Sequence, residues 1–343
     1  MRACVIHAAK DLRVEDRPET DLEPEQVRLS FGYGGICGSD LHYVAEGRVG
    51  DSIVRDPMVL GHEFSGRVLE VGSAVTDLQP GEQVVVNPSL HCGECRYCRS
   101  GRTNLCQNMR YLGSAAKRPH QNGGFVERPV VHRRQCVKIP AQADLRLAAL
   151  AEPYAIALHA VRRGGDLTGR KVLVTGAGTI GTLIAIAARR AGAAEIVVTD
   201  ITDAPLRRVR EMVADQVINV ATEAEAVAAL TDAKDIDVAI EASGASAGLE
   251  MAVQAAAPGG RIVQVGFLPP SGRLSINGLL TKELDLVGAY RFEDEFNDAV
   301  AEIVEGKVDL SWVVTGDYPV DRLDEAFEVA ADRNRSLKVL IHF

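Results

Sequence analysis

Residues 35–43, with the sequence GICGSDLHY, bring a thiol, a hydroxyl, a carboxylate, an imidazole and a phenol together within nine positions. Further along the chain lie His62 and Glu63 in the sequence GHE, and Glu152 in the sequence AEP. Cys37, His62 and a carboxylate would form a mixed sulfur, nitrogen and oxygen ligand set, which suits a catalytic zinc with an exchangeable position. Each residue also has a simpler interpretation, since Cys37 can be a buried thiol, His62 a hydrogen-bonded core histidine and Glu152 an acid at a helix N-terminus.

Four of the seven cysteines lie close together in the sequence, at Cys92, Cys95, Cys98 and Cys106. This spacing allows four thiolates to surround one Zn²⁺ tetrahedrally, and such a closed site has a structural role. Disulfides would need an oxidising compartment, and charges that interrupt the N-terminal apolar run predict that the chain has no secretory signal. The remaining cysteines outside the two zinc sites, Cys4 and Cys136, lie in apolar runs and are interpreted as packed thiols.

A glycine-rich loop follows an apolar run in KVLVTGAGTIG, residues 171–181. The GxGxxG pattern is informative here because it follows a predicted buried strand and opens a predicted helix. Backbone N–H groups and the helix dipole at such a loop can bind a pyrophosphate. We therefore expect the following loop residues to contact a dinucleotide: Gly176, Gly178, Thr179, Ile180 and Gly181.

Asp200 ends the next predicted strand, at the distance where an acid accepts hydrogen bonds from both ribose hydroxyls of NAD. Its carboxylate would repel the 2′-phosphate of NADP, so NAD is favoured, although Arg207 and Arg208 leave NADP open. Asp200 could alternatively only cap the following helix. Val265 and Gly266, after a later strand, complete the expected cofactor contacts.

The composition limits the class of protein. The chain has 343 residues, enough for two domains, with 38 basic against 47 acidic residues and a net charge of −9. This acidic balance argues against a nucleic-acid or anionic-membrane partner. No apolar stretch is long enough to span a bilayer, and we expect a cytoplasmic protein.

The pattern of elements changes along the chain. Short apolar runs separated by glycine and proline, without a long helical period, predict an irregular all-β body over residues 1–140, including a strand in GGFVERPVV. From residue 171, near-continuous apolar strands alternate with helical segments, which predicts an α/β fold with a doubly wound parallel Rossmann sheet. The expected strands are 171–176, 195–200, 216–220, 237–243, 261–267 and 284–290, and the expected helices are 182–192, 204–214, 223–233 and 247–258.

Over essentially its full length the chain resembles the zinc-dependent medium-chain dehydrogenases. GHEFSGRVLEVGSAV is similar to their zinc signature, the cysteine-rich segment to their structural-zinc lobe, and GAGTIG to their cofactor loop. The resemblance implies a mostly β GroES-like catalytic domain, residues 1–145 and 291–343, with the structural zinc lobe at 92–106. A Rossmann domain that binds NAD, residues 146–290, would be inserted in it.

Glu152, followed by Pro153, stands where many alcohol dehydrogenases have a third zinc-binding cysteine, so the chain is similar to the polyol branch. The resemblance implies that Cys37 and His62 bind the catalytic zinc, with Glu63 and Glu152 as direct or water-mediated ligands. Two Zn²⁺ ions per chain are expected, one catalytic and one structural.

Other matching positions imply further roles. Ser39 would take the proton of the substrate hydroxyl, and His42 would pass it outward by way of the cofactor ribose. Asp40 would orient the zinc-binding histidine, and Tyr43 and Arg291 would contact the polyol. One departure is Val44, where sorbitol dehydrogenases usually have a tryptophan.

The resemblance implies hydride transfer between NAD and a secondary alcohol of a sugar acid or polyol. NPSLHCGECRYC and MRYLGSAAKRPHQNGGF are similar to a branch that acts on the sugar acid L-idonate, with sorbitol or xylitol as the alternative substrates. Arg110, His120 and Arg291 are candidates for binding the substrate carboxylate, whereas Lys117 and Arg118 are as well explained by a solvated basic loop. A non-catalytic zinc protein that senses NAD is the alternative from another class.

The last expected strand of the sheet, residues 284–290, would lie at its edge. An apolar edge strand that is exposed to water favours pairing with another chain. We expect a homo-oligomer, with a tetramer as the form that the resemblance implies.

Overall fold

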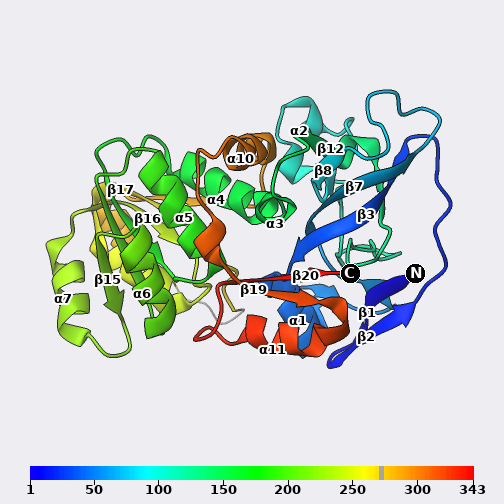
Figure 1. The fold of residues 1–343 in the computed structure, drawn as a ribbon. Coiled ribbons are helices and arrows are strands. Elements are labelled where there is room, and N and C mark those ends of the chain that lie inside the picture. The colour runs from blue at the N-terminus through cyan, green and yellow to red at the C-terminus, as the bar shows by residue number, and fades with distance from the viewer. Residues whose placement is uncertain (270–273) are drawn as a thin grey trace. The chain divides into compact units, whose positions relative to one another are not determined.

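The structure, a computed structural model, describes residues 1–269 and 274–343 and divides the chain into two compact units (Figure 1). Unit 1 contains residues 1–152, 296–332 and 338–343. Unit 2 contains residues 153–295 and 333–337. The chain therefore leaves unit 1 once for a long insertion and again for a five-residue segment near its C-terminus.

Unit 1 is built on a seven-stranded sheet of order β12-β8-β7-β3-β20-β19, with β11 paired to β3. A second sheet of order β2-β1-β6 and two small strand pairs, β9 with β10 and β4 with β5, complete its strands. The strands are β1 (Arg2–Ala8), β2 (Asp11–Asp16), β3 (Gln26–Gly35), β4 (Arg48–Val49), β5 (Ser52–Ile53), β6 (Met58–Val59), β7 (Glu63–Val71), β8 (Gln83–Val86), β9 (Ser89–Leu90), β10 (Arg110–Tyr111), β11 (Val130–His132), β12 (Cys136–Ile139), β19 (Val314–Pro319) and β20 (Lys338–His342).

The helices of unit 1 are short. They are α1 (Gly38–Glu46), α2 (Arg96–Arg99), α3 (Leu145–Ala148), α10 (Glu295–Val304) and α11 (Leu323–Ala331), with single 3₁₀ turns at Thr103–Leu105, Arg133–Gln135, Ser311–Val313 and Val320–Arg322. Glu295, the first residue of α10, belongs to unit 2.

Strand β3 shows why this segment pairs in the centre of the sheet. Val27, Leu29 and Phe31 alternate with more exposed residues, so one face of the strand is buried. The Phe31 ring stacks on Phe64 of β7 with ring centroids 5.9 Å apart, and it meets the Phe125 ring edge-on at 6.2 Å. This aromatic cluster stabilises the β3–β7 pair, whose paired ends lie next to Cys37 and His62 and include Glu63.

Two predictions for residues 1–140 were wrong. A nine-residue helix, α1, occupies residues 38–46, where too few apolar residues occur to reveal a helical period. The Asp40 carboxylate caps it by accepting a hydrogen bond from the Cys37 N–H, and Gly47 ends it at φ 69°. In GGFVERPVV only the last residues enter a strand, since Pro129 has no N–H to donate.

Unit 2 contains a six-stranded parallel sheet of order β15-β14-β13-β16-β17-β18. Its strands are β13 (Lys171–Thr175), β14 (Glu195–Asp200), β15 (Gln216–Asn219), β16 (Ile236–Glu241), β17 (Ala256–Gln264) and β18 (Asp285–Gly288). Its helices are α4 (Ala151–Gly164), α5 (Thr179–Arg190), α6 (Asp203–Met212), α7 (Ala224–Ala233), α8 (Ser246–Ala255) and α9 (Ile276–Lys282), of which α4 begins two residues inside unit 1.

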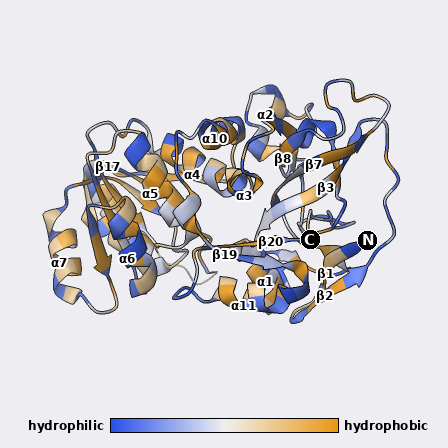
Figure 2. Cartoon of the chain, viewed as in Figure 1, coloured by the Kyte–Doolittle hydropathy of each residue, from blue (hydrophilic) through white to orange (hydrophobic). Residues whose placement is uncertain are grey.

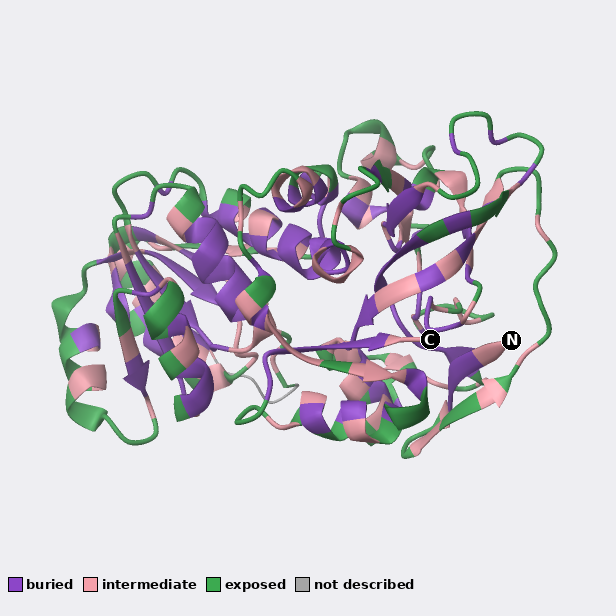
Figure 3. Ribbon diagram, in the orientation of Figure 1, coloured by how far each residue is buried: buried purple, intermediate pink, exposed green. Residues whose placement is uncertain are grey.

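The strand order reverses between β13 and β16, so right-handed crossovers place helices on both faces of the sheet. Strands β13, β14 and β16 are buried along almost their whole length (Figure 3). Helix α6 mixes hydrophobic and hydrophilic residues (Figure 2) and buries Leu206 and Val209. The predicted doubly wound α/β fold is confirmed.

One helix of unit 2 ends earlier than predicted. The helix expected over 247–258 ends at Ala255, and β17 begins at Ala256. Pro258 lacks the N–H that a helix interior needs, and the following glycines disfavour helix as well. Among the described residues, no helix is both long and apolar enough to cross a membrane.

Candidate metal centres and cofactor site

The first candidate metal centre lies in unit 1, where the end of β3 is paired with the start of β7. Cys37 precedes helix α1 directly after β3, and His62 immediately precedes β7. Gly35 pairs with Glu63 across the two strands, which brings residues distant in sequence together. One ligand atom each of Cys37, His62 and Glu63 lies within 4.8 Å of the others, and His62 and Glu63 are buried.

Glu63 has a strong partner within the protein. Both its carboxylate oxygens accept hydrogen bonds from the Lys338 Nζ atom, at 2.9 and 2.7 Å, and the same ammonium donates to the Ile36 carbonyl at 3.0 Å. Glu63 is 0% and Lys338 2% exposed. Burial alone would lower the pKa of Lys338, but the adjacent Glu63 charge raises it. A Cβ atom at position 35 would lie 2.1 Å from Glu63 Oε2, so only glycine leaves room for this carboxylate.

Asp40 approaches the histidine of this centre from the side of helix α1. Its Oδ2 atom accepts from the Cys37 N–H at 3.0 Å, and its Oδ1 atom lies 3.9 Å from His62 Nδ1. Burial raises the pKa of the Asp40 carboxyl. Burial opposes protonation of His62, yet the charges of Cys37 and Asp40 raise its pKa well above the usual value. Asp40 therefore faces His62 without a hydrogen bond to it, and its Oδ1 atom is buried without a hydrogen-bond partner among the described residues.

Glu152 supplies a second carboxylate next to this centre. Its Oε1 atom accepts a hydrogen bond from the Tyr111 hydroxyl, and the Tyr111 ring lies 5.8 Å from the His62 ring, measured between centroids. Its Oε2 atom is buried and has no hydrogen-bond partner among the described residues. Burial raises the pKa of Glu152 to about 7, against the lowering effect of His62.

A buried carboxylate oxygen without a partner is costly, and a bound cation would satisfy it. The neighbouring thiol, imidazole and carboxylate are ligands that Zn²⁺ accepts. The residues present therefore fit zinc, held by Cys37, His62 and one or both glutamates. When bound, zinc supplies a Lewis acid that polarises a hydroxyl oxygen.

The second candidate metal centre consists of the four clustered cysteines. Cys95 and Cys98 place their Sγ atoms 3.6 Å apart, and those of Cys92 and Cys106 are 3.5 Å apart. Zn–S bonds of about 2.3 Å at tetrahedral angles put sulfur atoms about 3.8 Å apart. All four are free thiols, and hydrogen bonds from backbone N–H groups lower the pKa of Cys95 to about 6. The arrangement fits a closed structural zinc site.

The candidate cofactor loop lies between β13 and α5 in unit 2. Gly176 has φ +93°, and a Cβ atom on Gly181 would lie 1.8 Å from the Gly176 carbonyl oxygen. These two positions therefore require glycine. Gly178 precedes helix α5, whose first residues are Thr179 and Ile180. The loop exposes the helix N-terminus at the strand-order reversal, where doubly wound sheets bind ligands.

Asp200 ends the adjacent strand β14 and is bonded to this loop. Its Oδ2 atom accepts from the Ala177 N–H at 2.8 Å, and its Oδ1 atom accepts from the N–H groups of Ile201 and Thr202 at 2.7 and 3.0 Å. The carboxylate is thus held in one position beside the glycine loop.

Comparison with known proteins identifies the family. The Alcohol dehydrogenase GroES-like domain family matches residues 23–141, and the Zinc-binding dehydrogenase family matches residues 179–305. L-idonate 5-dehydrogenase (NAD(P)(+)) of Escherichia coli is 36% identical over 342 residues, covering 100% of this chain and 98% of the relative. The chain belongs to the zinc-dependent medium-chain dehydrogenase family. This dehydrogenase is an oxidoreductase with zinc and a nicotinamide dinucleotide as cofactors.

Other relatives of this dehydrogenase extend the comparison. Sorbitol dehydrogenase of Bacillus subtilis is 32% identical and covers 100% of this chain and 97% of the relative. The crystal structure of L-idonate 5-dehydrogenase from Escherichia coli matches with a TM-score of 0.94, covering 100% of this chain and 98% of that chain at 36% identity. A putative zinc-binding dehydrogenase from Sinorhizobium meliloti bound to NADP matches with a TM-score of 0.91 at 28% identity, covering 100% and 99%.

The residues expected to move the substrate proton lie on helix α1 of the dehydrogenase. Ser39 is partly exposed, two residues after Cys37. The His42 side chain is 61% exposed, with Nδ1 3.4 Å from Glu46 Oε1. Tyr43, on the same helix, is buried and its hydroxyl accepts from the Ala115 N–H at 3.0 Å.

The three residues that are candidates for binding the substrate carboxylate differ in their surroundings. Arg110 is exposed at the start of β10. Both ring nitrogens of His120 have backbone partners, since Nε2 accepts from the Arg55 N–H at 2.9 Å and Nδ1 lies 2.8 Å from the Lys117 carbonyl. Arg291, in unit 2, has φ +57° and lies over the Tyr290 ring at 4.8 Å.

Three residues that hold the candidate sites were not found by sequence reasoning. Tyr111 and Lys338 hold the two candidate metal-binding glutamates, as described above. Glu241, at the end of β16, accepts from the N–H groups of Ser243 and Gly244 at 2.8 and 2.9 Å, and its backbone carbonyl accepts from Val265 and Gly266. Glu241 therefore connects two loops at the edge of the sheet where the cofactor is expected. The sequence signal that could have identified Glu241 was an acidic residue at the end of a buried strand.

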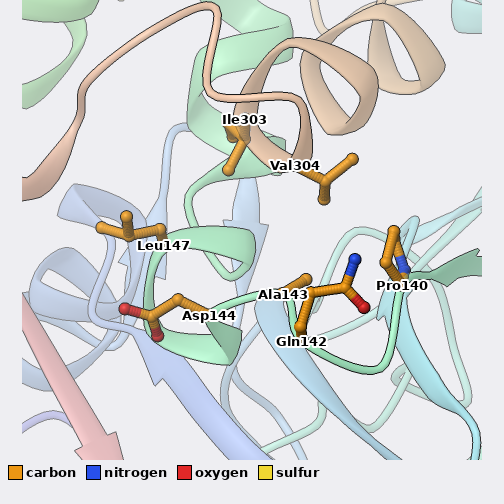
Figure 4. Close-up of a pocket in the computed structure, with 7 residues that line it drawn as sticks. All are labelled: Pro140, Gln142, Ala143, Asp144, Leu147, Ile303 and Val304. Atoms are coloured by element: carbon orange, nitrogen blue, oxygen red, sulfur yellow. The ribbon is translucent and has the colours of Figure 1, made fainter.

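A cavity of about 140 Å³ lies in unit 1 (Figure 4), and none of its lining residues belongs to the two ligand clusters. It is lined by residues of the segment 140–144 together with Leu147, Ile303 and Val304. Its charged side chain, Asp144, already accepts a hydrogen bond from the Arg146 N–H as the cap of helix α3. The cavity has no group that links it to the dehydrogenase chemistry.

Proposed function

We propose that this dehydrogenase transfers hydride between NAD and the C5 hydroxyl of L-idonate, with 5-keto-D-gluconate as the oxidised product. Full-length similarity to L-idonate 5-dehydrogenase carries the choice of substrate. The geometry supports the reaction class, because Cys37, His62, Glu63 and Glu152 offer mixed donors for an open metal centre.

Other residues of the chain position the ligands, move the substrate proton and bind the cofactor in this proposal. Tyr111 and Lys338 hold the two glutamates by hydrogen bonds. We assign to Asp40, whose charge lies 3.9 Å from the His62 ring, the electrostatic orientation of the imidazole. We assign Ser39 to accept the proton of the substrate hydroxyl, and the exposed His42 to pass it toward solvent. The glycine loop and Asp200 hold the dinucleotide.

A second candidate substrate is a neutral polyol such as sorbitol or xylitol, which the similarity to sorbitol dehydrogenases favours. Idonate differs from these polyols by a carboxylate, for which Arg110 is the better placed candidate because both His120 ring nitrogens already have partners. Arg291 is the further candidate in unit 2.

The experiment compares kcat/KM for idonate, sorbitol and xylitol, each with NAD and with NADP. We expect idonate with NAD to be the best pair. Arg110→Ala should lower kcat/KM for idonate by about 10- to 100-fold, the equivalent of one charge-assisted hydrogen bond, and leave sorbitol nearly unchanged. Arg118→Ala is the matched control, because Arg118 lies in the same segment and is paired with Asp56. A wild-type preference for sorbitol or xylitol would establish a polyol dehydrogenase instead.

We also propose that this dehydrogenase is cytoplasmic and that it forms a homotetramer. Four free thiols arranged for zinc are typical of a reducing compartment. Strand β18 is at the edge of its sheet, and Leu286 on it and Tyr290 after it are exposed apolar side chains. Such an edge favours pairing with a second copy. Sedimentation equilibrium at micromolar concentration tests this, and a monomer would contradict it.

A further inference from the structure

The surroundings of Asp200 include a cation that lies far away in the sequence. The Arg333 Nη1 atom is 3.9 Å from the Asp200 Oδ1 atom. The two side chains differ in exposure, since Arg333 is 59% and Asp200 3% exposed. This separation is too long for a hydrogen bond, so the contact leaves the guanidinium donors available to another acceptor.

The segment that carries Arg333 is fastened to the cofactor loop. The Arg208 Nη2 atom on helix α6 donates to the Arg335 carbonyl at 3.2 Å. The Thr179 hydroxyl, at the start of helix α5, donates to the Leu337 carbonyl at 2.6 Å. Residues 333–337 are therefore held against the glycine loop and α6, and Arg333 stays beside Asp200.

The chemistry of the two nucleotides differs at this position. NAD presents a ribose 2′-hydroxyl, which a carboxylate such as Asp200 accepts, whereas NADP presents a 2′-phosphate, which an isolated carboxylate repels. An arginine next to that carboxylate offsets its charge and can bind the phosphate with two parallel N–H donors.

We propose that Arg333 is the specificity-determining residue that lets this dehydrogenase accept NADP as well as NAD. Asp200 binds the ribose hydroxyls of NAD, and Arg333 turns from Asp200 to the 2′-phosphate when NADP binds. Arg207, an exposed arginine on helix α6 after this strand, makes no ion pair with Asp200 among the described residues. The inference rests on the proposed placement of the adenosine ribose at Asp200, and not on the identity of the alcohol substrate.

The test measures nucleotide binding without any alcohol. NADH and NADPH are titrated into wild type, Arg333→Ala, Arg333→Lys and the control Arg207→Ala, and the reduced nicotinamide fluorescence gives each Kd. We expect wild type to bind both nucleotides. Arg333→Ala should weaken NADPH binding by about 10- to 100-fold and change NADH binding by less than about threefold.

Arg333→Lys should fall between wild type and Arg333→Ala for NADPH, because lysine keeps the charge but not the paired donors. Arg207→Ala should change both constants by less than about threefold, which subtracts the general effect of losing one positive charge. Equal weakening of NADH and NADPH, or no effect of Arg333→Ala on either, overturns the proposal. So does a wild-type protein that does not bind NADPH. Failure of idonate as a substrate would leave these binding constants unaffected, so the two proposals fail separately.

Discussion

Replacing Lys338 by methionine should destabilise unit 1 strongly, because the substitution leaves Glu63 as a buried anion without its partner. The Lys338 ammonium contacts both Glu63 oxygens at 2.9 and 2.7 Å, and both side chains are at most 2% exposed. Removal of one member of a buried ion pair costs about 3–5 kcal/mol. For a unit of this size that corresponds to a melting temperature lowered by roughly 6–20 °C.

The measurement is a thermal melt, followed by circular dichroism, of protein from which a chelator has removed the zinc at Cys37 and His62, so that no metal ion compensates the Glu63 charge. Lys138→Met is the matched control, because it removes a lysine from the solvent-exposed pair with Glu82 in the same unit. That surface pair contributes about 0–1 kcal/mol to the free energy of unfolding. The double variant Lys338→Met with Glu63→Gln should regain part of the lost melting temperature, since no unpaired charge remains. If Lys338→Met melts no lower than Lys138→Met, the reasoning about this buried pair is refuted.

Three further outcomes are expected. Cys95→Ser should give protein with one zinc fewer by metal analysis and a lowered melting temperature, because structural zinc contributes folding free energy; unchanged zinc content would contradict the four-cysteine site. Tyr111→Phe should speed the release of the catalytic zinc to a chelator and weaken its affinity by about 10- to 100-fold, as it removes a hydrogen bond from Glu152; a wild-type rate of release would count against it. Burial would raise the pKa of Glu295, but hydrogen bonds from His159 and the Glu293 N–H lower it from 4.5 to about 2. This shift corresponds to about 3 kcal/mol of folding free energy at neutral pH. A lowered pKa stabilises the folded state above pH 4.5. The melting temperature of Glu295→Gln should therefore lie furthest below that of wild type at pH 6–7, and the difference should become smaller as pH falls below about 4.5. A difference in melting temperature that does not change with pH would contradict this.

Local patterns in the sequence were sufficient for the parts of the protein that short segments build. The cysteine spacing at residues 92–106 and the GxGxxG loop after an apolar run both predict their sites from neighbours in the chain. The alternation of buried strands and helices predicts the doubly wound sheet in the same way, since periodicity reflects which face of each element is buried. Helix α1 was missed because its stability comes from the Asp40 cap and from tertiary contacts.

How the candidate site residues are held could be read only from the folded chain. Lys338 is 275 residues from Glu63, and it reaches that carboxylate because β20 pairs with β3. In the same way the fold brings Arg333 to Asp200, whereas the sequence analysis considered only Arg207 and Arg208, which lie seven and eight residues after Asp200. Hydrophobic periodicity in the sequence indicates which face of each segment is buried, but not which buried charges contact one another. A buried charge is stable only when a group of opposite charge compensates it. The candidate ligands and the glycine loop were therefore predictable from the sequence, whereas the partners that position them come from segments that only the folded chain brings together.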